Sequence, residues 1–446
     1  MSRATRPDVS PSRPRRARQR VVVGIEVLEV RSLLSSAAVI QWRMAPRFTP
    51  DPNRGGQVDL PNTPAYVNPP DGYEVLLDAS HSQGVQRGAS FTWTITASAG
   101  SPIVVKGANP DVRLPEGTYA VQLEADNLRG AKGPVFTSSS VVVKDRLIVA
   151  IGDSYASGEG NPVVPGYSVF RSPRWAYSPD TAMNLENTNA HRSTLAGPAQ
   201  FALALQASDP HVAVTFVSVA NSGATIAQGL LGPMPSIGDP NAILPAQIDE
   251  LHRIVGSHPI DTLTISIGAN DIGFSTRVQQ LITSNAVGTP TLGTIQGQVE
   301  ASLATLSPQY AMLGQAIRGL NPAKVLITEY PDLTRNSRGL VAPVVVAGVS
   351  VISTAEVQFA LDRILNPLDQ TVQAAATANG WTYVGGLSTA FRTHGYPSSN
   401  SWFRSVGQSY RMQDSRVGAF HPNAQGHQAI AKGLLAAYQQ ARPPGT

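Results

Sequence analysis

The residues best suited to chemistry are a serine and a histidine near opposite ends of the chain. The serine, Ser154, ends the stretch LIVAIGDS, in which an apolar run leads into a tight turn. The apolar run predicts a buried strand, and in open parallel α/β sheets ligands bind outside the carboxyl ends of the strands. A serine there can act as a nucleophile if a base lies within hydrogen-bond reach. The stretch alone is equally compatible with an ordinary glycine-rich turn.

The candidate base is His421, in the stretch AFHPNAQGH. It precedes a proline and then an amphipathic pattern, so we expect it in the loop that leads into the last helix. Among the eight histidines, His421 alone combines a loop position with a proline-braced backbone close to a helix start. His427 lies inside the expected helix, where we expect it to be packed or capped.

Two other strand ends carry groups that could bind an oxyanion. Gly223 follows the apolar run AVTFVSVA, and a glycine lets its backbone N–H approach a ligand closely. Asn270 follows the run TLTISIG, and an asparagine at a strand tip can donate a side-chain N–H to an oxyanion. The alternative is that Gly223 is an ordinary loop glycine and that Asn270 or Asp271 merely caps the next helix.

These four residues need a scaffold that brings strand ends together. After Arg146, strand-like runs alternate with amphipathic helical runs up to the C-terminal region. This alternation predicts a parallel sheet covered by helices on both faces. We therefore expect one three-layer α/β/α domain over residues 146–440, followed by a tail over 441–446.

Residues 38–145 have a different, all-β pattern. Short alternating runs are separated by Gly, Pro, Asn and Asp signals, as in a small β-sandwich. Trp93 stands in the middle of one run, and Tyr119 follows the turn Pro115-Glu116-Gly117, as a corner tyrosine would. The region offers no catalytic residues and no cluster of metal ligands, so we expect it to act as a support.

Composition restricts the chemistry further. The 446 residues contain no cysteine, which excludes disulfide bonds, thiolate metal sites and cysteine catalysis. Seven of the 34 basic residues but only one of the 30 acidic residues lie within residues 1–20, so the basic balance belongs largely to this arm. We therefore expect no nucleic-acid partner for the folded part. No apolar run approaches the roughly 18 residues of a transmembrane helix.

Residues 1–37 form the expected arm. Its first 20 residues are rich in Arg, Pro and Ser, which predicts disorder, and they lead into VVVGIEVLEVRSLLSSAAV. A basic region before an apolar segment suggests a secretory signal, although two glutamates and an arginine interrupt the run. The stretch IEVLEVRSLLSSA is also similar to a short tag, of LExRxLLS type, of bacterial surface and secreted proteins. We expect a secreted or cell-surface protein; a plain amphipathic segment is the alternative.

Four blocks in order carry a family resemblance. They are GDS at 152–154, SGAT at 222–225, GAND at 268–271 and HPNAQGH at 421–427. With them, residues 146–440 resemble the SGNH hydrolases, the GDSL-type esterases and lipases. HRSTLAGPAQ at 191–200 and FRTHGY at 391–396 further resemble a subgroup of secreted bacterial esterases.

The resemblance implies a role for each residue. Ser154 would be the nucleophile and His421 the general base. The backbone N–H groups of Ser154 and Gly223 and the side chain of Asn270 would form the oxyanion hole. This chemistry needs no metal and no organic cofactor.

The chain departs from the family pattern beside the histidine. The family places an Asp three residues before it, where this chain has Gly418. In the resembling subgroup a backbone carbonyl orients the imidazole, which gives a Ser–His dyad, and we expect the same here. Asp414, the nearest upstream carboxylate, is the rival.

A second departure concerns cysteines. The subgroup carries them where this chain has Ala190, Asn221 and Pro397. Packing and hydrogen bonds must therefore hold loops that disulfides usually tie together.

Several other side chains have less specific expectations. We expect Asp153 and Glu159 to support the turn around the serine rather than to act chemically. Aromatic residues that either line the substrate site or pack in the core are Trp402, Phe403, Tyr410 and Phe420. The loops expected to shape the pocket are 161–190, 275–297 and 333–355.

The all-β region has a resemblance of its own. LDASHS, FTWTI, LPEGTYAVQLEAD and VVVKD resemble a PKD-type immunoglobulin-like domain, which implies a spacer or a module that contacts a surface or polysaccharide. Together these features predict a serine carboxylic-ester hydrolase acting on a small-molecule, lipid or acylated-polysaccharide ester. The alternatives are a carbohydrate O-acetyl esterase and a non-catalytic surface-binding protein.

Overall fold

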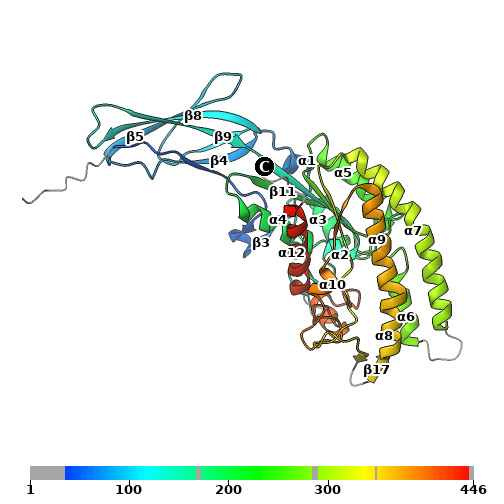
Figure 1. The fold of residues 1–446 in the computed structure, drawn as a ribbon. Coiled ribbons are helices and arrows are strands. Elements are labelled where there is room, and N and C mark those ends of the chain that lie inside the picture. Colours follow the sequence, from blue (N-terminus) through cyan, green and yellow to red (C-terminus); the bar gives the residue numbers. More distant parts are fainter. Residues whose placement is uncertain (1–35, 167–171, 284–289, 347–348, 441–446) are drawn as a thin grey trace, which may run out of the picture.

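The chain folds into an elongated all-β domain and a larger α/β domain that are joined end to end (Figure 1). The computed structural model describes residues 36–166, 172–283, 290–346 and 349–440. The arm and export segment expected over 1–37 fall almost entirely outside these residues. Within the described residues, no helix combines the length and the apolar character needed to cross a membrane.

Two antiparallel sheets form the all-β domain. One has the strand order β1-β4-β7 and the other the order β6-β5-β8-β9. The strands are β1 (Gln41–Met44), β4 (Tyr73–Asp78), β5 (Val85–Thr96), β6 (Ile103–Lys106), β7 (Asp111–Leu114), β8 (Gly117–Leu128) and β9 (Val135–Val143). Trp93 is fully buried in the shared core. The Tyr119 hydroxyl donates to Pro115 O at 2.9 Å, and so fixes the turn into β8 as a corner tyrosine does.

A parallel sheet of strand order β11-β10-β14-β15-β18 forms the centre of the α/β domain. The strands are β10 (Asp145–Gly152), β11 (Ala213–Ser218), β14 (Thr262–Ser266), β15 (Val325–Thr328) and β18 (Thr382–Val384). All of their pairings are parallel. Residues of β10, β11 and β14 are buried along the whole strand, as strands covered on both faces must be. The expected α/β/α domain, preceded by an all-β domain, is confirmed.

Successive residues of β10 point to opposite faces of the sheet. Leu147, Val149 and Ile151 join one apolar core, and Ile148 and Ala150 join the other. The first core is covered by α5 (Gln247–Val255), α6 (Phe274–Thr283), α7 (Leu292–Leu320), α8 (Thr354–Ala360), a π-helical turn (Leu361–Leu365) and α9 (Asn366–Asn379). The second is covered by α4 (Gly197–Ser208), α10 (Leu387–Ala390) and α12 (Ala424–Gln440). These helices form the two outer layers (Figure 1).

Short elements complete the α/β domain and are listed here with their bounds. They are α2 (Ser154–Ser157), α3 (Thr181–Asn189), β12 (Met234–Pro235), β13 (Ile243–Leu244), β16 (Val344–Val346), β17 (Val349–Ile352) and α11 (Val406–Gln413). The strands β16 and β17 pair as an antiparallel hairpin.

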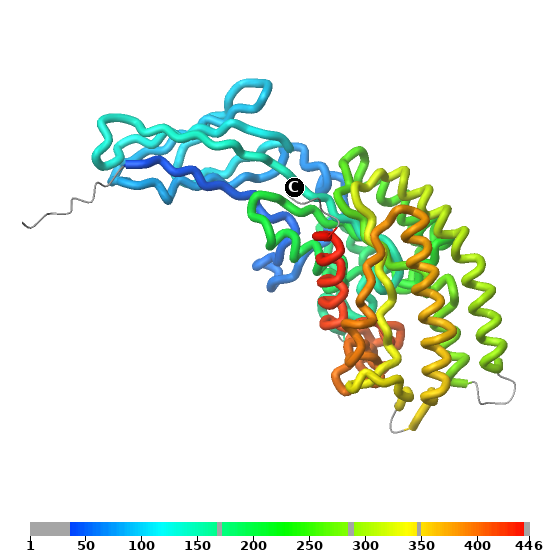
Figure 2. The backbone as a smooth tube through the Cα atoms, viewed as in Figure 1, coloured from blue at the N-terminus to red at the C-terminus, as the bar shows by residue number. Residues whose placement is uncertain are grey.

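The segment between β1 and β4 leaves the sandwich and packs on the α/β domain (Figure 2). It contains β2 (Pro50–Asp51), a 3-10 turn (Pro52–Arg54), β3 (Gln57–Val58) and α1 (Pro64–Val67). The Phe48 ring lies 4.9 Å from that of Phe216 on β11, and Asn62 Nδ2 donates to Ser218 O at 2.7 Å. The range 38–145, expected for the sandwich, thus includes a segment whose side chains belong to the core of the α/β domain.

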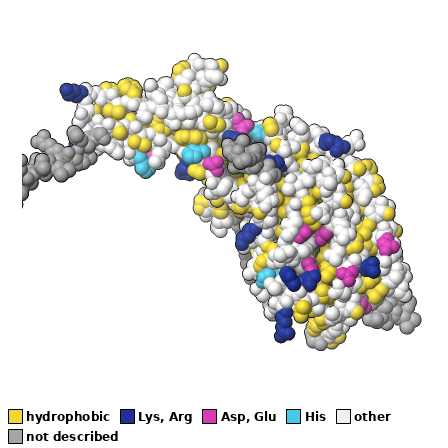
Figure 3. Space-filling view, in the orientation of Figure 1, with side chains coloured by type: hydrophobic (Ala, Val, Ile, Leu, Met, Phe, Trp, Pro, Cys, Tyr) yellow, Lys and Arg dark blue, Asp and Glu magenta, His cyan; other side chains and the backbone are white. Residues whose placement is uncertain are grey.

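Only Lys144 separates β9 from β10, so the two domains meet at the first residue of β10. There Asp145 N donates to Glu116 Oε1 at 2.8 Å, and Arg47 Nη1 lies 3.7 Å from the Asp145 carboxylate. Burial raises the pKa of Asp145 to about 6. This junction lies at the opposite end of β10 from Ser154. On the face seen in Figure 3, Lys and Arg side chains lie singly or in small groups over both domains.

Candidate active site

The turn after β10 presents Ser154 at the carboxyl edge of the sheet. Gly152 has a φ of +136°, and a Cβ on it would lie 2.1 Å from Ser266 O, so this position requires glycine. Asp153 then caps α2, because its Oδ1 accepts from Tyr155 N at 3.0 Å. Ser154 is therefore the first residue of α2, and 8% of its surface is exposed to solvent.

His421 lies directly against this serine. Its Nε2 is 2.7 Å from Ser154 Oγ, and its Nδ1 is 3.1 Å from Ala419 O. A carbonyl oxygen can only accept, so Nδ1 carries the proton and Nε2 is left to accept from the serine hydroxyl. Burial lowers the pKa of His421, which favours the neutral imidazole.

Backbone contacts fix the loop that carries His421. Phe420 has a φ of +65°, and its carbonyl accepts from Tyr155 Oη at 3.1 Å. Arg404 N donates to His421 O at 2.8 Å, while Phe420 N donates to Arg404 O at 2.9 Å. The ring of Tyr155 also lies 5.5 Å from the imidazole. Tyr155 on α2 and the backbone of Arg404 thus hold the loop that carries the imidazole.

Position 418 has no room for a side chain. A Cβ on Gly418 would lie 2.6 Å from Gly160 Cα, so the family's aspartate cannot stand here in this backbone. Asp414 ends α11 with a φ of +54°. Within the described residues, no hydrogen bond joins Asp414 to His421, and the Nδ1 contact is to Ala419 O.

Gly223 and Asn270 lie on two segments that contact each other and the serine turn. Asn221 N donates to Gly152 O at 3.1 Å, which ties the Gly223 segment to the end of β10. Asn270 Nδ2 donates to Ala224 O at 2.9 Å, and Gly223 has a φ of +84°. Among the described residues, the amides of Ser154 and Gly223 donate no hydrogen bond to the protein.

Neither Asn270 nor Asp271 caps the next helix. Asn270 reaches Ala224, and Asp271 Oδ1 accepts from Ile226 N at 2.9 Å, well before α6 begins at Phe274. Burial raises the pKa of Asp271 to about 6. Both side chains therefore hold the 224–226 segment against the end of β14.

Tyr330 is a residue of the site that the sequence patterns did not single out. Its hydroxyl lies 2.5 Å from Asp153 Oδ2 and accepts from Ala269 N at 3.1 Å. Burial raises the pKa of Asp153 to about 7. Its hydrogen-bond donors, the Tyr330 hydroxyl and the Tyr155 backbone N–H, are neutral groups. Tyr330 lies two residues after the end of β15, so the strand-end rule that located Asn270 also points to it.

Hydrogen bonds hold the segments around Ala190, Asn221 and Pro397. Arg192, which is 1% exposed, donates to Val219 O, Ala220 O and Asn221 Oδ1 and pairs with Glu186 at 2.8 Å. Ser222 N also donates to Ala190 O at 3.1 Å. Beside Pro397, Ser398 Oγ lies 2.9 Å from Ser337 Oγ.

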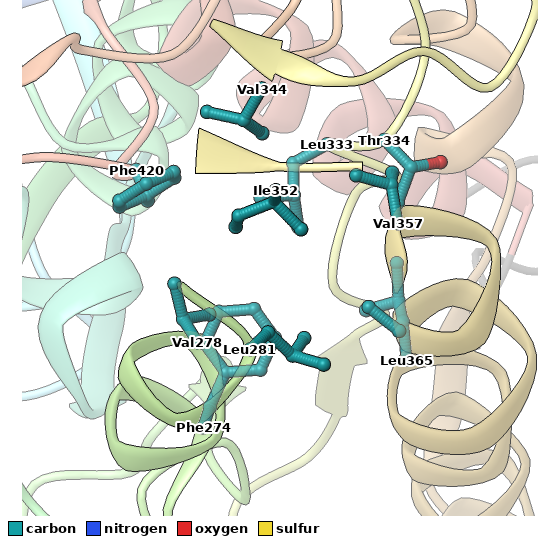
Figure 4. A pocket seen from close by; sticks show the side chains of 11 residues that line it. Phe274, Val278, Leu281, Leu333, Thr334, Val344, Ile352, Val357, Leu365 and Phe420 are labelled. Atoms are coloured by element: carbon teal, nitrogen blue, oxygen red, sulfur yellow. The ribbon is translucent and has the colours of Figure 1, made fainter. Parts of the chain in front are cut away.

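An apolar pocket opens beside the His421 loop (Figure 4). It is lined by Phe274, Val278, Leu281, Leu333, Thr334, Val344, Ile352, Val357, Ala360, Leu365 and Phe420. A second cavity shares Phe274, Leu333 and Leu365 with it and reaches Tyr155, the residue after the nucleophile. The two cavities are both apolar and share these three lining residues, one of them beside Tyr155 and the other beside the β16–β17 hairpin and α8.

The pocket draws residues from two of the three ranges expected as loops, 275–297 and 333–355, but residues 275–283 and 292–297 are helical, so the expectation of a loop there is wrong. Of the four aromatic residues considered for it, Phe420 lines it. Phe403 is buried in the core of the second layer, Trp402 stacks on His394, and Tyr410 is 49% exposed. In the described part of the chain, no group of three or more His, Asp or Glu side chains is placed to hold a metal ion.

Comparisons with known proteins match the α/β domain. The sequence profile of the GDSL-like lipase/acylhydrolase family matches residues 150–429. No curated protein sequence matches the chain. Similar solved structures include an extracellular lipase from Streptomyces rimosus, at 24% identity and a TM-score of 0.43, covering 67% of this chain and 100% of that one. A phospholipase A1 from Streptomyces albidoflavus has 21% identity and a TM-score of 0.43, with 67% and 99% covered. An acetylxylan esterase from Geobacillus stearothermophilus has 13% identity and a TM-score of 0.31, with 66% and 95% covered.

Proposed function

This chain belongs to the GDSL-like lipase/acylhydrolase family and is an ester-bond hydrolase, and we propose that Ser154 and His421 catalyse its reaction as a dyad. The contact between His421 Nε2 and Ser154 Oγ at 2.7 Å carries the proposal. A serine hydroxyl is a weak nucleophile until a base within this distance takes its proton. The carbonyl of Ala419 takes the place of the usual third carboxylate, because it keeps the imidazole in the tautomer that can accept at Nε2.

The reaction then proceeds in two halves. Ser154 Oγ attacks the ester carbonyl carbon while its proton passes to His421 Nε2. The tetrahedral intermediate collapses, the C–O bond to the alcohol breaks, and His421 gives its proton to the leaving alcohol oxygen. In the second half, His421 takes a proton from water, which attacks the acyl carbon. The acid leaves, and the proton returns to Ser154 Oγ.

The oxyanion of each intermediate would be bound by three donors: Ser154 N, Gly223 N and Asn270 Nδ2. The contact of Asn270 with Ala224 O uses one of its two amide hydrogens, so the other stays available. Fixed donors of this kind stabilise the charge that develops on the carbonyl oxygen in the transition state.

We propose an ester with an aliphatic acyl chain as the substrate. The two apolar cavities, one beside Tyr155 and one beside the β16–β17 hairpin, support this, because the methylene groups of an acyl chain that entered them would be desolvated. An acetyl group needs no such cavities, so the pocket favours esterase or lipase activity over carbohydrate O-acetyl esterase activity.

For the all-β domain we propose a PKD-type module, over 38–145, in an exported protein whose hydrolase domain spans 146–440. The corner tyrosine and the buried Trp93 support this relationship. The domain joins the first residue of β10, at the far end of the strand from Ser154, so a spacer role fits better than a role in substrate binding.

Hydrolysis of p-nitrophenyl esters from acetate to dodecanoate by the full chain and by Ser154→Ala tests this function. We expect the wild type to hydrolyse these esters, with the highest kcat/KM for an ester whose acyl group is longer than acetyl. We expect no hydrolysis above background for S154A. If only acetylated xylan is deacetylated, the carbohydrate alternative holds. If folded wild type hydrolyses neither kind of substrate, the proposed dyad is wrong.

A further inference from the structure

Glu159 is a buried carboxylate on the nucleophile turn that the proposed reaction does not use. It is 0% exposed, and its backbone N–H donates to Ser154 O at 3.0 Å. Its Oε1 accepts from Gln413 Nε2 at 2.6 Å and from Gly160 N at 3.2 Å, and its Oε2 lies 2.7 Å from His191 Nδ1. A buried carboxylate is costly unless it is paired, so this one is held by a dedicated set of partners.

The partners of Glu159 place its carboxylate next to the His421 loop. Gly160 packs directly on Gly418, as the 2.6 Å approach of a Cβ at 418 shows. That same Cβ would lie 3.0 Å from Gln413 Oε1, while Gln413 Nε2 donates to Glu159. The side-chain amide of Gln413 thus lies between Gly418, where the family pattern has an aspartate, and the carboxylate of Glu159.

Charges around His421 come from few directions. Glu159, on the turn after α2, raises the pKa of the His421 imidazole against the effect of burial. On α12, burial lowers the pKa of His427 to about 3, so that ring is neutral. Tyr155 on α2 contributes its ring, and the 417–419 segment contributes backbone carbonyls. The Arg404 guanidinium donates to Gly160 O and Asn161 Oδ1, while the Arg404 backbone pairs with Phe420 and His421.

Glu159 itself stays ionised. Burial raises the pKa of its carboxyl, but the interactions with His191, which hydrogen-bonds it, and with His421 outweigh this and lower the pKa to about 2. The Trp175 ring stacks on His191 at 4.3 Å and covers this pair.

We propose that Glu159 is a positioning residue that supplies the negative charge opposite the His421 imidazolium during proton transfer. The inference rests on the proposed Ser154–His421 dyad. The Ala419 carbonyl orients the ring but carries only a dipole, whereas the imidazolium formed in the transition state is a full charge in a buried site. Glu159 therefore acts through His421 from the nucleophile turn, without a hydrogen bond to the ring.

A purely structural role for Glu159 predicts the opposite pH behaviour. If Glu159 only braces the turn, its loss loosens the site, admits water to His421 and raises the imidazole pKa. If Glu159 stabilises the imidazolium, its loss lowers that pKa. The acid limb of kcat/KM reports this group in the free enzyme, so its direction of movement separates the two roles.

The test compares full-length wild type, Glu159→Gln, Glu159→Asp and the control Glu250→Gln in a pH-stat assay over pH 4–9. Glu250 is also buried and ion-paired, to Arg253, but lies on α5 away from His421. For E159Q we expect kcat about 10-fold lower, KM within about 2-fold, and an acid limb shifted to lower pH by about 0.5 to 1. E159D keeps the charge, so its acid limb should stay with that of the wild type, as should that of E250Q.

A second variant guards against misfolding of E159Q. Gln413→Lys leaves the carboxylate in place but sets an ammonium beside it, and we expect the same acid shift. The inference is overturned if the acid limb of kcat/KM stays in place or moves to higher pH in either variant. It is also overturned if E159Q has the kinetics of the wild type. The active fraction is counted in each case by fluorophosphonate labelling of Ser154. A wild type that cannot be labelled contradicts the dyad itself, whereas a labelled wild type with an unaltered E159Q contradicts only the role of Glu159.

Discussion

His421 Nε2 lies 2.7 Å from Ser154 Oγ, although 267 positions of sequence separate the two residues. The serine is held by the turn at Gly152, where β14 leaves no space for a side chain. The histidine is held by its own loop, through the backbone contacts of Phe420 with Tyr155 and Arg404. The pair is therefore set by the ends of two elements that converge at the carboxyl edge of the sheet, and the predictions below follow from that arrangement.

The first prediction concerns the pH dependence of wild-type kcat/KM. Burial lowers the pKa of His421 from its ordinary value of about 6.5, and only the neutral ring can accept the serine proton. As pH falls through this pKa, Nε2 is protonated and activity is lost, so the midpoint of the acid limb should lie below about pH 6.5. Initial rates at low substrate from pH 4 to 8 measure it. A midpoint above 6.5 would show that His421 is not desolvated in the free enzyme.

Removal of the Asn270 donor should slow turnover more than binding. For Asn270→Ala we expect kcat to fall about 10²–10³-fold with KM nearly unchanged, because the donor acts on the oxyanion and not on the ground-state carbonyl. Asn270→Asp keeps the size of the side chain but loses the N–H, and should be equally slow. Steady-state kinetics on one p-nitrophenyl ester give both constants. A kcat within about 3-fold of wild type in N270A would remove Asn270 from the oxyanion hole.

Asp414 should be dispensable. It ends α11 at a φ of +54°, which asparagine also tolerates, and the His421 Nδ1 partner is Ala419 O. Asp414→Asn should therefore keep kcat/KM within about 2-fold of wild type across the pH range. A fall of 10-fold or more at unchanged thermal stability would restore Asp414 as the group that orients the imidazole.

Filling the apolar pocket should shorten the preferred acyl chain. Val357 lines the pocket from α8. For Val357→Phe we expect kcat/KM on p-nitrophenyl octanoate to fall at least about 10-fold, while that on the acetate changes by less than about 3-fold, since each lost methylene contact is worth about 1 kcal/mol or more. Val357→Ala is the matched control and should not lose the longer ester. Equal losses on both esters in V357F would place the acyl chain elsewhere.

Much of the scaffold could be predicted from the sequence, because its signals are local. Buried strands are continuous apolar runs, and amphipathic helices alternate with them, so the sheet and the strand ends at Ser154, Gly223 and Asn270 follow from periodicity. The α/β/α fold and ester-bond hydrolysis are confirmed. The catalytic roles of the individual residues stay predictions.

The rest depends on tertiary contacts that leave no periodic signal. The segment around Phe48 is short and irregular. It is buried because Phe48 packs on Phe216 and because Asn62 donates to Ser218 O. Arginine is usually a surface residue, yet Arg192 is buried, and its guanidinium donates to oxygen atoms of residues 219–221. The pocket combines α6, the β16–β17 hairpin and α8, which meet only in the folded chain.

Covalent labelling of the nucleophile tests the central claim most directly. Wild type, Ser154→Ala and His421→Asn are each incubated with an alkyl fluorophosphonate, and intact mass and peptide mass are measured over time. The dyad predicts one adduct per chain, on the peptide that contains Ser154, no adduct in S154A, and labelling at least about 10³-fold slower in H421N. Labelling of wild type at another residue, or at an equal rate in H421N, would contradict the account.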